Sequence, residues 1–284
     1  MDLIEALYGN GETSSRPLWL DHWQYTGPLL LRGLPIPWFQ PTDFDGFFRK
    51  AHGLLEAEVV VFPISDLLQA HVQSAPELRG EMGSKKRTAF AARALLRDEA
   101  LRSRVRQCVN LTTQAAPSKP LVLSMPSPQD LLAWAYESAH GNSPEEIDAD
   151  LADSAAMYLS DFLSSLSDCA VAAVMAQENS QTESELTSFV PAYAPIRNAC
   201  SHLRWQFGLR LAGGLRIPEE FDFAVSANPR GAQSDGPTGA WLPKEFWLEE
   251  GDFQQPQTGF LYGQIPADAN PEFVLDRRKS LRAA

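Results

Sequence analysis

The feature that most constrains the fold is a repeated alternation of short apolar runs with segments of helical spacing, which continues over almost all 284 residues. The run VVVFPIS, residues 59–65, is too continuously apolar for a half-exposed strand, and is typical of a parallel sheet covered on both faces. The preceding segment, residues 41–57, carries its apolar side chains at helical spacing. No proline or glycine linker long enough to separate two domains interrupts the alternation. We therefore predict a single α/β domain over residues 1–284.

The runs that predict strands are short and rich in apolar residues. Besides 59–65, they lie at 119–128, 170–179, 209–214, 221–229 and 259–266. Within residues 16–38 we expect one short strand followed by an ordered loop. Helices are predicted at 41–57, 91–109, 129–139, 145–169, 190–208 and 270–282. The polar segment 76–90 and the region 230–257 are predicted to be mainly loop, Gly208 a helix C-cap, and Gly213–Gly214 a turn.

The number of strands decides between two kinds of parallel sheet. About seven or eight strands in a chain of this length favour a (β/α)₈ TIM barrel over an open doubly wound sheet. The phosphate-binding patterns G-x-G-x-x-G and G-x-x-x-x-G-K-[ST], which accompany many open sheets, are absent from the sequence. We therefore predict a TIM barrel and expect no cofactor.

Composition excludes several classes of partner. With 36 acidic and 24 basic residues the net charge is −12, which argues against a nucleic-acid partner. The sequence has neither a basic start followed by an apolar core nor an apolar window long enough to cross a bilayer, so no membrane association is expected. The three cysteines are odd in number and widely spaced, as suits a reducing cytoplasm. A small molecule is the expected partner.

Two carboxylates stand where apolar strands are predicted to end. Asp66 follows VVVFPIS and Glu178 follows AVAAVMAQ. In a TIM barrel the catalytic groups lie at the carboxyl ends of the strands, so both residues are candidates. Asp66 could instead cap the helix that follows it, and Glu178 could be a surface residue paired with a lysine or arginine.

An aromatic run near the amino terminus holds further candidates. Strand alternation would place Trp19, Asp21 and Trp23 on one face, with His22 on the other. His22 could transfer protons near neutral pH if it points into the barrel mouth, and otherwise is a packed histidine. His140 follows a predicted helix and could border the site.

Four segments resemble the uroporphyrinogen decarboxylase superfamily, whose barrel also serves cobalamin-dependent methyltransferases and cobalamin-independent methionine synthase. The segments are AEVVVFPISDLL, KPLVLSMPSPQDLLAWAYE, VMAQENSQ and PADANPEFV. The resemblance implies that Asp66 is the catalytic aspartate and that Trp134 replaces a substrate-contacting tyrosine. It also implies that Glu178 keeps its carboxylate beside Asn179, which stands in place of a serine, and that the protein forms a homodimer.

The departures from that family narrow the expected chemistry. The paired arginines of the decarboxylase's first strand are replaced by His22, Trp23, Gln24 and Tyr25, and Gly263 stands near the position of its histidine. The His-x-Cys pair and later cysteine that hold zinc in the methyltransferases are absent. We therefore expect no metal, and a substrate other than a porphyrinogen.

These observations predict a metal-independent, decarboxylase-like lyase for a small carboxylated, heterocyclic or otherwise electron-rich substrate. In this hypothesis a strand-end aspartate stabilises the protonated intermediate. The alternatives are a methyl or alkyl transferase of the methionine synthase-like branch and a non-catalytic binding subunit. The expected catalytic residues are Asp66, Glu178 and His22. The expected substrate-binding residues are Trp19, Trp23, Gln24, Tyr25, Trp134, Asn179 and His140.

Overall fold

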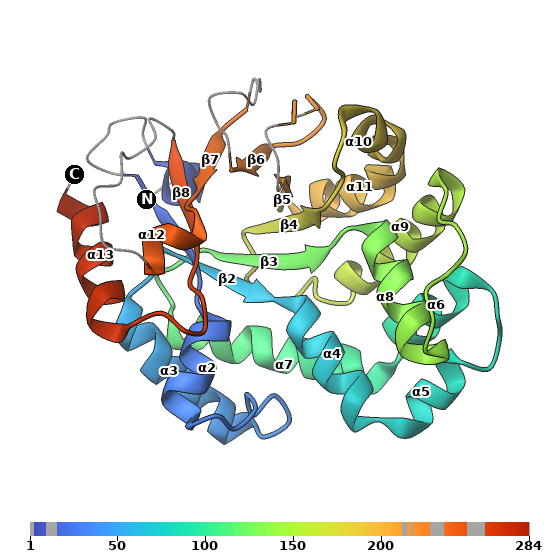
Figure 1. The fold of residues 1–284 in the computed structure, drawn as a ribbon, viewed down its shortest axis with the longest axis horizontal. Coiled ribbons are helices and arrows are strands. Elements are labelled where there is room, and N and C mark those ends of the chain that lie inside the picture. Colours follow the sequence, from blue (N-terminus) through green and yellow to red (C-terminus); the bar gives the residue numbers. More distant parts are fainter. Residues whose placement is uncertain are drawn as a thin grey trace.

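Eight parallel strands close into one barrel in the order of the sequence (Figure 1). The computed structural model describes residues 3–9, 16–211, 215–216, 218–227, 236–248 and 259–283. The strands are β1 (Leu18–Asp21), β2 (Val59–Pro63), β3 (Leu121–Pro126), β4 (Ala173–Glu178), β5 (Gln206–Leu211), β6 (Phe223–Ser226), β7 (Thr238–Trp241) and β8 (Phe260–Gln264). The fold is therefore the predicted (β/α)₈ TIM barrel.

Most helices lie outside the barrel beside β1 to β5 and β8 (Figure 1). The helices that precede β3 in the chain are α1 (Leu3–Tyr8), α2 (Trp23–Leu31), α3 (Pro41–Leu55), α4 (Ile64–Ser74), α5 (Pro76–Met82), α6 (Thr88–Arg97) and α7 (Glu99–Ala115). The helices that follow β3 are α8 (Pro128–His140), α9 (Ala149–Ser164), α10 (Glu183–Phe189), the 3₁₀ turn η2 (Val190–Tyr193), α11 (Ala194–Leu203), α12 (Lys244–Leu248) and α13 (Pro271–Ala283). None of these helices, within the ranges given above, is long and apolar enough to cross a membrane.

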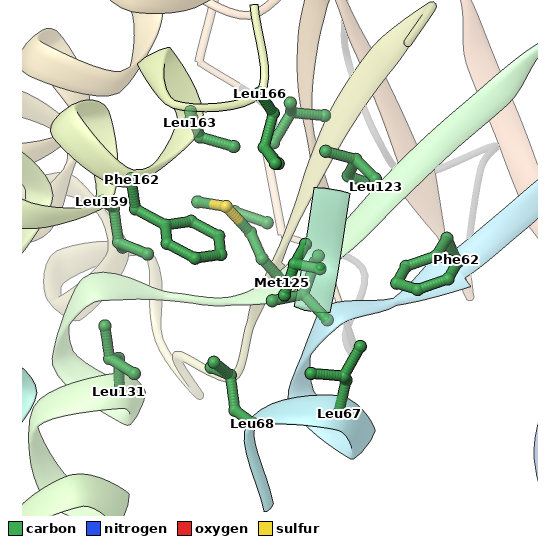
Figure 2. Packing of buried hydrophobic residues seen from close by; sticks show 14 of the residues in the cluster. Phe62, Leu67, Leu68, Leu123, Met125, Leu131, Leu159, Phe162, Leu163 and Leu166 are labelled. Carbon is green, nitrogen blue, oxygen red and sulfur yellow. The ribbon is translucent and has the colours of Figure 1, made fainter. Parts of the chain in front are cut away.

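The outward face of each strand packs on the helices. Phe62, Leu123 and Met125 belong to a large apolar cluster that also includes Leu68 of α4 and Phe162 of α9 (Figure 2). All five are at most 1% exposed. Because each fully buried side chain of this size contributes roughly 1.5–3 kcal/mol, this layer is a major source of the barrel's stability.

The inward face of the strands forms a second, separate core. Its side chains come from alternate positions of the strands, as the period of two requires. They are Trp19, Val59, Val61, Val122, Ala173, Met175, Phe223, Val225, Phe260 and Tyr262. The barrel centre is therefore packed with side chains and is not a channel.

Helix α1 closes the amino-terminal end of this inner core. The Tyr8 ring lies 6.1 Å from that of Trp19 and 5.6 Å from that of Phe260. The Trp19 indole N–H donates a 2.7 Å hydrogen bond to the carbonyl of Leu7. A ligand therefore has to approach the barrel from the carboxyl ends of the strands.

Two expectations about the β2 to β3 connection are wrong. Segment 76–90 is not a continuous loop, because it contains α5 and the start of α6. The helix expected at 91–109 is two helices that meet at Asp98, whose carboxylate accepts a 2.7 Å hydrogen bond from the backbone N–H of Leu101. An aspartate inside a helical pattern can thus begin a new helix by capping it.

Two further differences concern Gly208 and residues 23–31. Gly208 lies inside β5, where an added Cβ would come 2.4 Å from the carbonyl oxygen of Phe223. The preceding helix ends at Leu203 with Arg204 in the left-handed conformation. After β1 the chain forms α2, with Pro28 inside it, instead of the expected loop. The expected turn at Gly213–Gly214 lies outside the described residues.

Candidate functional site

Polar side chains replace apolar ones at the carboxyl end of the inner core. The strand ends bring five such groups onto the inward positions: Asp21 of β1, Ser124 of β3, Gln177 of β4, Arg210 of β5 and Gln264 of β8. Hydrogen-bond register places Arg210 opposite Gln177, and Gln264 opposite Asp21. We call these five residues the mouth cluster.

Arg210 is the centre of the mouth cluster. Its Nη1 donates to the Gln264 side-chain oxygen at 3.3 Å and its Nη2 to that of Gln177 at 3.1 Å. Its guanidinium lies 4.5 Å from the centre of the Trp241 ring and 6.0 Å from that of Tyr262. The side chain is 8% exposed, and its Nε is buried with no hydrogen-bond partner. Arg210 is thus a buried cation fixed by neutral groups.

The two glutamines extend this arrangement to both sides. Gln177 donates from Nε2 to the Ser124 hydroxyl at 2.7 Å, and Gln264 donates from Nε2 to the Asp21 carboxylate at 3.3 Å. Both amide oxygens therefore face Arg210, which fixes the orientation of each amide. Gln177, Gln264 and Trp241 are partly exposed, so solvent reaches this end of the barrel.

Asp21 is a buried carboxyl group with an unusual affinity for its proton. Burial, together with the negative charge of Asp66, raises its pKa from 3.8 to about 7. The charge of Arg210 and a hydrogen bond from the backbone N–H of Trp23 act in the opposite direction. Burial and the charge of Asp21 also raise the pKa of Tyr262. Asp21 thus changes protonation state near neutral pH.

Asp66 follows the end of β2 by three residues, instead of directly as expected. Strand β2 ends at Pro63, so Asp66 belongs to the first turn of α4, where its side chain does not cap the helix. Its carboxylate has no hydrogen-bond or ion-pair partner among the described residues, and burial raises its pKa. Strands β1 and β2 are paired neighbours, so Asp21 and Asp66 follow adjacent strands at the same end of the barrel, and the charge of Asp66 raises the pKa of Asp21.

Glu178 ends β4 as expected but faces away from the barrel interior. It shares the outward positions with Val174 and Ala176, whereas Gln177 faces inward. Its carboxylate accepts hydrogen bonds from Gln129 at 2.9 and 2.7 Å, from the backbone N–H and hydroxyl of Ser180 at 2.9 Å each, and from Tyr193 at 2.6 Å. With every acceptor position used, Glu178 ties β4 to α8 and η2. The alternative of a surface residue paired with lysine or arginine is wrong, because Glu178 is 1% exposed and none of these contacts is with a lysine or arginine.

His22 follows β1 and is fully buried outside the mouth cluster. Its Nδ1 lies 3.1 Å from the Thr26 hydroxyl, and its ring stacks on those of Trp23 and Phe48. Burial is the main reason that its pKa falls to about 3. The structure therefore agrees with the packed alternative and leaves His22 neutral at ordinary pH.

The expected substrate-binding residues do not come together at one place. Trp19 lies beside α1 at the amino-terminal end of the barrel. Trp23 and Tyr25 are buried in α2, where the Trp23 indole donates to the carbonyl of Val61 at 2.7 Å. Strand alternation holds for Trp19 and Asp21 but not for Trp23, because β1 ends at Asp21.

The remaining expected residues are peripheral. Gln24 is exposed on α2, and the half-buried Trp134 packs on the outer core from α8. His140 ends α8, with its ring 4.3 Å from that of Tyr136. Asn179 is exposed and donates to Asp130 at 2.9 Å. None of these contacts involves the mouth cluster.

The sequence contains one signal that could have identified the mouth cluster. Arg210 interrupts the apolar run LRL at an inward position of a predicted strand. A charged side chain at such a position is unusual enough to mark a site. Within the part of the chain that the structure describes, no three histidine, cysteine, aspartate or glutamate side chains are placed to hold a metal ion.

Comparisons with known proteins add little to this description. No family model and no curated protein matches the chain. The matching solved structures include that of TcOYE, an old yellow enzyme, with pHBA. It is 12% identical, with a TM-score of 0.48, over 94% of this chain and 89% of that chain. The class that the geometry defines is a TIM barrel with a polar cluster at the carboxyl ends of its strands, where such barrels carry their active sites.

Proposed function

We propose that this protein is a lyase that removes carbon dioxide from a small carboxylated, electron-rich substrate bound at the carboxyl end of the barrel. The observation that carries the proposal is that Asp21 and Asp66 follow the adjacent strands β1 and β2, and that Asp21 is also within the influence of the buried cation Arg210. The charge of Asp66 raises the pKa of Asp21, and burial raises the pKa of Asp66. Pairs of carboxyl groups whose surroundings shift their pKa values are a common basis for acid–base chemistry.

Each carboxyl group has a separate role. Protonated Asp21 donates its proton to the ring carbon that bears the substrate carboxylate, which leaves Asp21 ionised and the ring cationic. Unpaired Asp66 stabilises that cation electrostatically. The bond to the carboxylate then breaks, its electrons return to the ring, and carbon dioxide leaves. Asp21 recovers its proton from solvent.

Asp66 keeps the role expected from the sequence, the stabilisation of the protonated intermediate, whereas Asp21 takes the place of Glu178 and His22 as the proton donor. Glu178 has no free acceptor position, and His22 is buried away from the cluster. Asp21 feels the charge of Asp66 and is able to hold a proton near neutral pH. The position of Asp66 just after β2 also supports membership of the uroporphyrinogen decarboxylase superfamily, which we retain as part of the proposal.

Release of carbon dioxide tests the proposal directly. Purified protein is incubated with carboxyl-labelled pyrrole, indole and hydroxybenzene carboxylates, and the labelled carbon dioxide is counted. We expect turnover of at least one compound, with a loss of 10²-fold or more in Asp21→Asn and a comparable loss in Asp66→Asn. Asp153→Asn, on the exposed face of α9, is the matched control. Turnover that survives in both Asp21→Asn and Asp66→Asn would refute the proposal.

A further inference from the structure

Arg210 has more hydrogen-bonding capacity than the protein uses. A guanidinium has five N–H donors, and the oxygens of Gln177 and Gln264 take two of those of Arg210. The Nε donor is buried without a partner. A buried donor that stays unsatisfied destabilises the fold, so such a group is a candidate for binding a ligand.

The charge of Arg210 is also without a direct counter-ion. No carboxylate within the described ranges forms an ion pair with it, and the two side-chain oxygens that accept its hydrogen bonds belong to neutral amides. The carboxyl group of Asp21, on which the charge of Arg210 acts, has a pKa raised to about 7 and is largely protonated at slightly acidic pH. An anion that binds here would therefore meet a desolvated cation already held in place, which is the arrangement that gives strong carboxylate binding.

The walls around Arg210 restrict the shape of that anion. Trp241 covers the guanidinium at 4.5 Å, and the Tyr262 ring lies 6.1 Å from that of Trp241 in an edge-to-face arrangement. The anion therefore has to approach the guanidinium edge. Flat aromatic walls favour a flat ligand over a bulky saturated one.

A carboxylate held by Arg210 is poorly placed to be lost as carbon dioxide. Bidentate hydrogen bonds stabilise its negative charge, and its departure would leave Arg210 buried without an anion. The carboxylate that leaves needs the opposite surroundings, which Asp66 provides because it has no compensating cation. Anchoring and cleavage thus call for different groups on the substrate.

We infer that Arg210 anchors a carboxylate that the reaction retains, so that the substrate is a planar dicarboxylate whose second carboxylate lies beside Asp21 and Asp66. The inference rests on the proposed function for the fate of the second carboxylate. The anchor itself can be tested by binding alone.

Three unreactive benzene derivatives serve as probes: benzoate, isophthalate and benzamide, titrated at pH 6 by calorimetry. We expect benzoate and isophthalate to bind and neutral benzamide to bind at least tenfold more weakly. Arg210→Lys keeps the charge but loses the planar fork, and should weaken both anions at least tenfold. Arg93→Gln, an exposed arginine of α6, is the matched control. Asp66→Asn should strengthen isophthalate binding several-fold more than benzoate binding, because only isophthalate has a carboxylate beside Asp66.

One measurement on the unaltered protein covers the case in which Arg210→Lys folds poorly. Benzoate should shift the Arg210 Nε–H signal in a proton–nitrogen NMR spectrum, since this donor gains a partner. Equal binding of benzamide and benzoate, an unshifted Nε–H signal, or equal effects of Asp66→Asn on both anions would overturn the inference. Binding that needs Arg210 without any release of carbon dioxide would refute the proposed function and leave the anchor. Carbon dioxide release that is unaffected in a folded Arg210→Lys would refute the anchor and leave the proposed function.

Discussion

Replacing Asp21 by asparagine should stabilise the protein at alkaline pH and have little effect in acid. The rise of the Asp21 pKa from 3.8 to about 7 means that the folded protein holds this proton more tightly than the unfolded chain does. Stability is therefore lost as the pH rises from about 4 to about 7, and the loss reaches roughly 4 kcal/mol above pH 7. Asparagine removes this dependence because its amide does not ionise.

The assay is urea unfolding of both proteins at pH 5 and pH 8. The contributions of the other titrating groups cancel when the free energy of unfolding of the native protein is subtracted from that of Asp21→Asn. Asp66 is the exception, because its coupling to Asp21 is part of the effect. We expect Asp21→Asn to gain about 2–3 kcal/mol relative to the native chain between these pH values. Asp153→Asn should show no such gain. If the free energies of unfolding of Asp21→Asn and the native protein differ by the same amount at pH 5 and pH 8, the reasoning is refuted.

Three further predictions concern residues outside the mouth cluster. Glu178→Gln places an amide N–H₂ against donors and should cost about 2–4 kcal/mol in chemical unfolding, without changing benzoate binding. Gly208→Ala forces a methyl group against β6 and should cost about 1–3 kcal/mol, which a lowered midpoint in a thermal scan would reveal. His22, whose pKa is about 3, should keep the NMR shifts of a neutral ring from pH 8 down to pH 5, and titration near pH 6.5 would contradict its buried position.

The barrel could be predicted because its signal is local and repeated. Seven of the eight strands overlap predicted apolar runs. Strand β7 and helix α12 instead lie in the segment 230–257, which the sequence predicts to be mainly loop. The errors occur where one residue decides between two local structures. Asp98 begins a new helix within a pattern that looks continuous, and Gly208 lies in a strand because its missing Cβ makes room for Phe223.

The site was harder to predict because it depends on register and strand ends. Glu178 and Gln177 are adjacent, yet only Gln177 faces the barrel interior, and the boundary of β4 alone does not reveal this. Asp21 and Gln264 are 243 positions apart and meet only because β1 pairs with β8. Aromatic residues near the first strand suggested a pocket, but α1 and α2 use them in packing instead.

The account depends most on a proton held by Asp21 near neutral pH beside the charge of Asp66. The direct measurement is the carbon-13 NMR titration of the aspartate carboxyl groups, with Asp21 assigned by its loss in Asp21→Asn. The account predicts that Asp21 titrates near pH 7 in the native protein, and at lower pH in Asp66→Asn, because the repulsion that raises its pKa is removed. Titration of Asp21 near pH 4, or no change in Asp66→Asn, would contradict it.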